Sequence, residues 1–132
     1  RPGGGKIINI SSGAGKKGIA RYAAYCASKF AIVGFTQAMA QEMAEHRVNV
    51  NAICPGLVDT ERADFIAAAL APEGESAKEF RADMVRERSV QVPMGRIAQG
   101  DDIARMAAFL ASSESDYMTG LSISVSGGSE MN

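Results

Sequence analysis

The chain has 132 residues, of which 46% are hydrophobic and 22% are charged, and its formal net charge is −1. These values are typical of a soluble globular chain of one domain, which can bury about two-thirds of its unfolded surface. The nearly neutral charge gives no electrostatic case for binding to nucleic acid or to a membrane surface. No apolar run reaches about 20 residues, the length that a membrane-spanning helix needs, and no signal-peptide pattern opens the sequence.

The two cysteines, Cys26 and Cys54, each lie in an apolar segment. We therefore expect them to be small core residues in a reduced, cytoplasmic setting, and we expect no metal site. The sequence begins at Arg1 without an initiator methionine, which suggests truncation.

The first predicted elements are a strand, a glycine-rich loop and a long helix. Residues 6–12 (KIINISS) are rich in β-branched residues and follow glycines, which predicts a buried parallel strand. Residues 13–21 are predicted to be loop, and residues from about 22 to 45 are predicted to be helix. Apolar or small residues occupy most of the circumference of this helix, so we expect a sheet on one side and a subunit partner on the other. The residues expected to be buried are Ala23, Ala27, Phe30, Ala31, Gly34, Phe35, Ala38, Met39 and Met43.

A second strand is predicted over residues 48–54, ended by Pro55-Gly56 because a proline cannot continue the ladder. A strand, a long helix and a second strand in this order form a βαβ unit, so the two strands should be parallel. Two helices follow at about residues 59–70 and 76–90, the second opening with a Ser76 and Glu79 capping box. Its apolar stripe is narrow, which suits a mobile flap better than a core helix.

The last predicted elements are a helix that begins at Asp101 and Asp102 and a strand over residues 120–126. Negative charge at the start of a helix is favoured by the helix dipole. We expect the helix to face the core with Ile103, Met106, Ala107 and Leu110, and the strand to point Leu121, Ile123 and Val125 inward. The elements together predict an α/β half-domain with three strands.

Tyr25 and Lys29 are the strongest candidates for chemistry. Residues four apart lie on one helix face, with Cβ atoms about 5–6 Å apart. A free phenol has a pKa of about 10 and is a poor base near neutrality. At an effective dielectric constant of ~20, an ammonium ~4 Å away favours a phenolate by at most about 4 kcal/mol. The pair therefore predicts a tyrosine that transfers protons.

An ordered set of residues resembles the short-chain dehydrogenase/reductase family: Ser12, Tyr25, Lys29, Pro55, Gly56 and Thr60. The resemblance continues through the YMTG sequence at residues 117–120 and through Gly127-Gly128. The Tyr-x-x-x-Lys pattern alone is weakly specific, whereas the ordered set is strongly specific. The resemblance implies the carboxyl-terminal half of a doubly wound parallel-sheet, Rossmann-like domain. Residues 1–132 would form this single partial domain, with a substrate-loop flap at about 59–95.

The same resemblance implies a role for each residue. Tyr25 would be the acid/base, Lys29 would stabilise its phenolate and hydrogen-bond the nicotinamide ribose, and Ser12 would hydrogen-bond the carbonyl oxygen. Only the family spacing selects Ser12 over Ser11. The remaining cofactor contacts would be Pro55 and Gly56 as the wall of the nicotinamide pocket, with the Val58 backbone and the Thr60 hydroxyl on the carboxamide. Weaker substrate-contact candidates are Gly13, Phe65, Ile66 and Met84.

The sequence GAGKKG at residues 13–18 also matches the dinucleotide fingerprint G-x-G-x-x-G. Residues 19–21 separate its last glycine from the helix, and Cys54-Pro55 stands where the acidic residue of the fingerprint should be. We prefer a substrate-loop turn whose glycines provide backbone freedom.

The preferred hypothesis is an NAD- or NADP-dependent oxidoreductase that interconverts a secondary alcohol and a ketone by hydride transfer, in a homodimer or homotetramer. Polyol, sugar and 3-hydroxyacyl substrates are all compatible with the motifs. By resemblance, the carboxyl-terminal sequence GGSEMN slightly favours polyols. The glycine-rich cofactor loop of the family precedes the serine strand and is not in this sequence, so we expect the chain alone to be inactive. Two alternatives stay open, a nucleotide-binding module that uses the turn at residues 13–18 and a non-catalytic remnant.

Overall fold

Three parallel strands form the centre of the molecule. The computed structural model describes residues 3–131, apart from the side chain of Arg62. Strands β1 (Gly5–Ile10), β2 (Val48–Pro55) and β3 (Ser122–Val125) pair in the order β1-β2-β3. Both pairings are parallel, with Ile7 opposite Val50 and Ile53 opposite Ile123. The predicted βαβ unit with parallel strands is confirmed.

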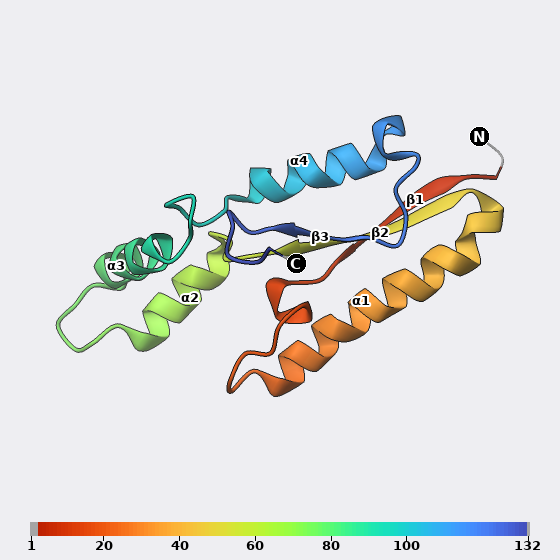
Figure 1. Cartoon of the computed structure of the whole chain (residues 1–132). Coiled ribbons are helices and arrows are strands. Elements are labelled where there is room, and N and C mark those ends of the chain that lie inside the picture. The colour runs from red at the N-terminus through yellow and green to blue at the C-terminus, as the bar shows by residue number, and fades with distance from the viewer. Residues whose placement is uncertain (1–2, 132) are drawn as a thin grey trace.

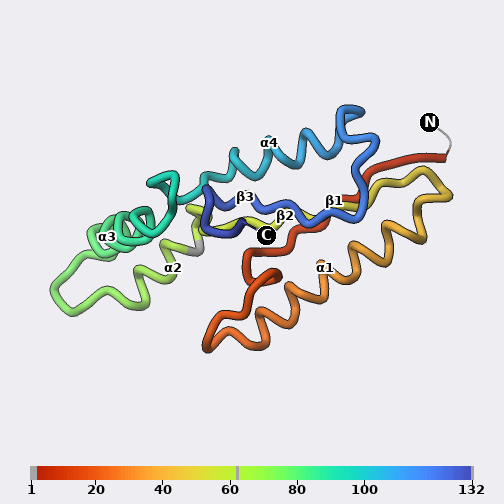
Figure 2. Tube along the Cα trace, in the orientation of Figure 1, coloured from red at the N-terminus to blue at the C-terminus, as the bar shows by residue number. Residues whose placement is uncertain are grey.

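Helices cover both faces of this sheet. Helix α1 (Ala23–Met43) lies on one face and α4 (Gly100–Ala111) lies on the other, as Figure 1 shows. Helices α2 (Glu61–Leu70) and α3 (Ala77–Val90) pack against each other and project beyond the carboxyl ends of the strands (Figure 2). Short 3-10 turns are η1 (Gly13–Gly15), η2 (Ala44–His46) and η3 (Ser113–Ser115). The fold is therefore α/β and Rossmann-like, with three parallel strands and flanking helices.

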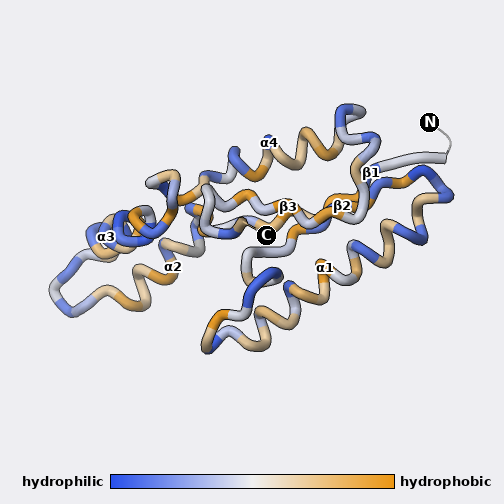
Figure 3. Tube along the Cα trace, in the orientation of Figure 1, coloured by the Kyte–Doolittle hydropathy of each residue, from blue (hydrophilic) through white to orange (hydrophobic). Residues whose placement is uncertain are grey.

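The core lies along the central strand. Val50, Ala52, Ile53 and Cys54 of β2 have no exposed surface, because this strand is paired on both sides and covered on both faces. In Figure 3 hydrophobic colouring predominates where the β2 label stands. Cys54 and Cys26 are buried free thiols, as predicted.

Helix α1 buries other residues than the sequence predicts. Cys26, Thr36 and Ala40 are buried, and Thr36 Oγ1 accepts a hydrogen bond from Asn9 Nδ2 at 2.9 Å. Of the expected core residues only Met39 and Met43 are half-buried, and the others are exposed: Ala23, Ala27, Phe30, Ala31, Gly34, Phe35 and Ala38. The prediction of the buried face was wrong because apolar residues lie on nearly all sides of the helix, so periodicity does not single out one face.

The ends of the strands also differ from the prediction. Strand β1 ends at Ile10, before the two serines, and β2 extends through Pro55, which pairs with Val125. The ladder tolerates Pro55 because the N–H of Gly56 donates to Val125 O at 3.1 Å. Leu121 precedes β3 and is 42% exposed, so it does not point inward as expected.

The predicted start of α3 is confirmed, whereas α2 begins two residues later than predicted and α4 begins one residue earlier, at Gly100. Ser76 Oγ accepts from Glu79 N, and the Glu79 carboxylate accepts from Ser76 N, which forms the capping box of α3. The Ser76 hydroxyl, which also donates to Glu79 Oε2 at 2.7 Å, and the Ser76 N–H hold the pKa of Glu79 below its ordinary value. In α4, Leu110 is buried and Ile103, Met106 and Ala107 are half-buried, as the stripe predicts.

Among the described residues, β1 pairs on one side only, so its other edge is open. None of the helices that the structure describes is long and apolar enough to cross a bilayer. The described residues also contain no group of three or more His, Cys, Asp or Glu side chains placed to hold a metal ion.

Candidate active site

The carboxyl ends of the three strands form one edge of the sheet, the carboxyl edge, where residues that are far apart in the sequence lie close together. Because all three strands are parallel, the loop of residues 11–22 after β1 (the serine loop), Gly56 after β2 and Ser126 after β3 leave the sheet at the same edge (Figure 1). Helix α1 begins near this edge, and its amino-terminal part packs against η1. Open α/β sheets bind ligands at the carboxyl ends of their strands.

The loop after β1 gives the two neighbouring serines different environments. Ser11 is buried and its Oγ donates to Lys29 O at 2.8 Å, so it ties the strand to helix α1. Ser12 is half-buried and its Oγ accepts from Ala14 N at 3.2 Å at the start of η1. Since Ser12 Oγ accepts there, its own hydrogen is left to donate elsewhere. This arrangement favours Ser12 over Ser11 as a substrate contact.

The structure brings the predicted tyrosine and lysine together on the first turns of α1. Lys29 Nζ lies 5.7 Å from the centroid of the Tyr25 ring, within range of a cation–π interaction. Lys29 Nζ also donates to Ile10 O at 3.3 Å, so the lysine is anchored to the end of β1. Tyr25 is 39% exposed and meets the Tyr22 ring edge-on. The phenol is therefore accessible, and its neighbouring cation is held in place.

The exits of β2 and β3 lie in direct contact. A Cβ on Gly56 would lie 2.9 Å from Ser126 Cα, so only a glycine fits there without movement of the backbone. Farther along, Val58 forms a parallel bridge with Ala98, in which Asp59 N donates to Ala98 O at 2.8 Å. In such a bridge the polar backbone groups of Val58 point away from Ala98. They are thus oriented toward the opposite side, where a ligand could meet them.

Thr60 occupies the N-cap position of α2, but its hydroxyl makes no capping hydrogen bond to any described residue. The side chain is exposed. Thr60 therefore precedes the first turn of α2, while its hydroxyl remains available to a ligand.

The weaker substrate candidates are spread over two regions. Gly13 is buried in the turn after Ser12, whereas the others lie on the projecting helices, where Phe65 is 75% exposed and Ile66 and Met84 are half-buried. Arg81 of α3 anchors this hairpin, because its Nη2 pairs with Asp59 Oδ1 at 2.6 Å and its Nε pairs with Asp64. The hydrogen bond that the Arg81 guanidinium donates to the Asp64 carboxylate is the main reason why the pKa of Arg81 is raised. No local sequence signal marks this anchor, because an ion pair between two helices joins residues that are far apart in the sequence.

The glycine-rich turn is built differently from the prediction. Neither Gly13 nor Gly15 has a positive φ, so backbone freedom is not what requires glycine there. A Cβ on Gly13 would lie 2.7 Å from Glu130 Cδ, and one on Gly15 would lie 2.4 Å from Ser11 Oγ. Close packing is the requirement instead.

The N–H groups of this turn are used within it. Gly15 N donates to Ser12 O at 2.9 Å, and Lys16 N and Lys17 N both donate to Gly13 O. A phosphate cradle needs such N–H groups to point at the ligand. The buried Glu130 carboxylate beside Gly13 would also repel an anion. Both observations count against the nucleotide-binding alternative.

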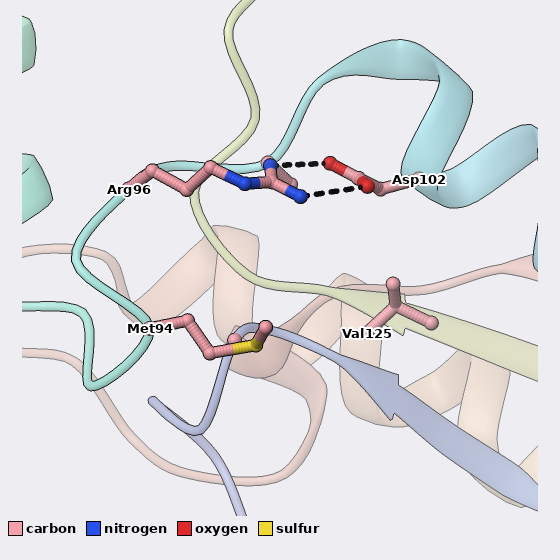
Figure 4. Close-up of a pocket in the computed structure, with 6 residues that line it drawn as sticks. Met94, Arg96, Asp102 and Val125 are labelled. Atoms are coloured by element: carbon pink, nitrogen blue, oxygen red, sulfur yellow. Dashed lines mark hydrogen bonds and ion pairs between the residues drawn. The ribbon is translucent and has the colours of Figure 1, made fainter.

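Two hollows flank this edge of the sheet. The first, of about 130 Å³, is lined by Met94, Arg96, Ala98, Asp102, Val125 and Gly127 (Figure 4). The Arg96 guanidinium donates two hydrogen bonds, of 2.7 and 3.0 Å, to the Asp102 carboxylate. These bonds and the one from the N–H of Gln99 hold the pKa of Asp102 far below its ordinary value. The second, of about 330 Å³, borders the serine loop and includes Lys17, Leu57 and Glu130 in its lining. No sequence motif marks Lys17 or Glu130 as a site residue.

Known proteins resemble this chain along almost its entire length. The family model described as enoyl-(acyl carrier protein) reductase matches residues 1–130. Galactitol 2-dehydrogenase of Agrobacterium fabrum is 45% identical over 132 residues, which are 99% of this chain and 50% of that protein. Diacetyl reductase [(S)-acetoin forming] of Staphylococcus aureus is 40% identical over 125 residues, which are 95% of this chain and 47% of that protein.

A solved structure agrees with these relatives. The ligand-free aldohexose dehydrogenase of Thermoplasma acidophilum matches with a TM-score of 0.82 and 31% identity, over 94% of this chain and 47% of that one. The chain thus spans about half the length of the curated relatives it matches. The matched family model, these relatives and the parallel sheet with Tyr25 and Lys29 at its edge agree, and the chain belongs to the short-chain dehydrogenase/reductase family.

Proposed function

We propose that this chain supplies the proton-transfer site of an NAD(P)-dependent oxidoreductase that interconverts a secondary alcohol and a ketone. The observation that carries the proposal is the anchored pair on α1. Lys29 Nζ lies 5.7 Å from the Tyr25 ring and donates to Ile10 O, beside the loop that presents Ser12. A proton donor, a fixed cation and a hydroxyl at one sheet edge are the groups that carbonyl reduction needs.

Each group has a distinct task in the reduction direction. The Tyr25 hydroxyl gives its proton to the substrate oxygen as negative charge develops there. The Lys29 ammonium stabilises the phenolate that remains, and Ser12 donates a hydrogen bond to the same substrate oxygen. The oxidation direction reverses these proton movements.

The residues after β2 fit the nicotinamide end of a dinucleotide. The Thr60 hydroxyl makes no capping bond among the described residues, and the polar backbone groups of Val58 point away from its bridge to Ala98. These groups would hold the carboxamide, beside a wall formed by Pro55 and Gly56. When bound, the nicotinamide supplies or accepts the hydride. We expect the isolated chain to bind neither NAD nor NADP tightly.

The proposed substrate is a polyol or sugar. The similarity to a galactitol dehydrogenase and to an aldohexose dehydrogenase supports this class. Because the chain is also similar to a diacetyl reductase, small diketones are the substrates against which polyols and sugars are to be compared. We also propose a homo-oligomeric enzyme, because α1 exposes the large apolar side chains of Phe30 and Phe35 at 45% and 55%.

The test joins the amino-terminal half of the Agrobacterium fabrum galactitol 2-dehydrogenase to this chain. The chimera is assayed with polyols and diketones, with NAD and NADP, by the absorbance of the reduced cofactor. Tyr25→Phe should lower turnover by roughly 10²–10⁴-fold, the usual contribution of a general acid/base. Tyr22→Phe is the matched control, since Tyr22 lies beside Tyr25 and has no lysine four residues later. Equal turnover of the two variants would overturn the proposal.

A further inference from the structure

The segment after β3 folds back toward the serine loop. Ser126 Oγ donates to Glu130 O and accepts from Glu130 N, each at 3.1 Å, so residues 126–130 form a closed turn. Gly127 and Gly128 have φ angles of 62° and 93°, which glycine adopts at low cost. This turn directs the Glu130 side chain back over the edge of the sheet, rather than away into solvent.

The Glu130 carboxylate is wedged between two parts of the candidate active site. Its side chain is only 9% exposed, and its Oε1 pairs with Lys17 Nζ at 3.0 Å. On one side, a Cβ on Gly13 would lie 2.7 Å from Glu130 Cδ, and on the other, a Cβ on Gly56 would lie 3.4 Å from Oε2. The carboxylate thus touches both the loop that carries Ser12 and the exit of β2.

Two residues of the serine loop, Gly13 and Lys17, contact this one side chain. Glu130 packs on Gly13, the residue after Ser12, and binds the ammonium of Lys17, whose backbone N–H donates to Gly13 O at 3.2 Å. Glu130 Oε2 is buried and has no hydrogen-bond partner among the described residues. Lys17 is therefore the cation that compensates a largely desolvated carboxylate, and its loss would leave a buried charge unpaired.

We propose that Lys17 and Glu130 form a latch that fixes the serine loop against the exit of β2, which makes Glu130 a positioning residue for Ser12. The structural part stands by itself, and the effect on catalysis rests on the proposed function. A hydrogen bond to a reacting oxygen is sensitive to small displacements of its donor. The latch holds Ser12 and Gly56 at a constant separation, so that the substrate oxygen and the nicotinamide wall keep their relative positions.

The structural test measures amide hydrogen exchange at Gly15 and Lys16, whose N–H groups bond to Ser12 O and Gly13 O. In the isolated chain, Lys17→Met and Glu130→Gln should each speed this exchange about tenfold, which corresponds to about 1.4 kcal/mol. The double variant should exchange no faster than Lys17→Met alone, because the two residues act as a unit.

Matched controls and a robust variant keep this test decisive. Lys78→Met and Glu42→Gln remove exposed charges elsewhere and should leave exchange at Gly15 unchanged. Should Glu130→Gln fail to fold, Lys17→Met still tests the latch, since the Lys17 side chain is 52% exposed. Unchanged exchange in Lys17→Met, or additive effects in the double variant, would overturn the proposal.

The catalytic test uses the chimera described above. Glu130→Gln and Lys17→Met should each lower kcat about tenfold (about 1.4 kcal/mol) and leave the KM for the dinucleotide unchanged. The kcat of the double variant should be no lower than that of Lys17→Met alone. The two proposals can fail separately. If Lys17→Met speeds amide exchange at Gly15 but the Tyr25→Phe chimera stays fully active, the proposed function alone is refuted. If Lys17→Met leaves amide exchange unchanged but the Tyr25→Phe chimera is inactive, the latch alone is refuted.

Discussion

Gly15→Ala tests whether close packing is what requires glycine in the turn after Ser12. The new methyl carbon would lie 2.4 Å from Ser11 Oγ and 2.7 Å from Lys29 O, whereas ordinary contacts begin at 3.4 Å. Ser11 can rotate only by giving up its hydrogen bond to Lys29 O, and that carbonyl belongs to the helix backbone. Overpacking costs about 1–3 kcal/mol, and the lost hydrogen bond adds about 1 kcal/mol. We therefore expect a loss of roughly 2–4 kcal/mol in the free energy of unfolding.

The assay is urea unfolding of the isolated chain, followed by circular dichroism. With a denaturant slope of about 2 kcal/mol per molar, the midpoint should fall by roughly 1–2 M. Gly18→Ala is the control, since a Cβ there would meet nothing within 4 Å. It should leave the stability unchanged or raise it by about 0.4–1 kcal/mol, because alanine restricts the unfolded chain. Equal midpoints for the two variants would show that the turn tolerates a methyl group and that the packing argument is wrong.

Three further changes probe the surroundings of the site. Gly56→Ala places a methyl 2.9 Å from Ser126 Cα, so the urea midpoint should fall by the equivalent of about 1–3 kcal/mol, and an unchanged midpoint would contradict the close contact. Asp102→Asn should lower stability at neutral pH, because a carboxyl with a depressed pKa contributes above its unfolded value of about 3.9; in a pH series the difference from the parent should shrink as the pH falls below that value, and a constant difference would refute the Arg96 pairing. Arg81→Met should speed proteolytic cleavage between α2 and α3, and unaltered cleavage would show that the anchor to Asp59 is dispensable.

The sequence was sufficient for the order and type of the elements, because local patterns encode them. β-branched runs bounded by glycine and proline marked the strands, and the Ser76 capping box marked the start of α3. The pairing of Tyr25 with Lys29 could also be predicted, since helix geometry alone brings residues four apart together. The roles of Ser12, Thr60 and the other proposed site residues remain predictions for the experiments above.

Contacts between distant segments could not be predicted. The buried face of α1 was predicted wrongly, because the sheet contacts small and polar residues such as Thr36 while Phe35 stays exposed. The reason for glycine at Gly13 lies in a side chain near the other end of the sequence, Glu130. A single acidic residue in a short tail has no periodicity or motif, so only the folded arrangement reveals its position.

The closed turn at residues 126–130 implies an order of events during synthesis. The serine loop leaves the ribosome long before Glu130 does, so Lys17 cannot meet Glu130 until the residues between them have been translated. Until then β1 and β2 can pair, but Lys17 in the loop between β1 and α1 lacks the carboxylate of Glu130. A nascent chain that ends before Glu130 would therefore carry both Tyr25 and Lys29, but its Ser12 would not be held in position.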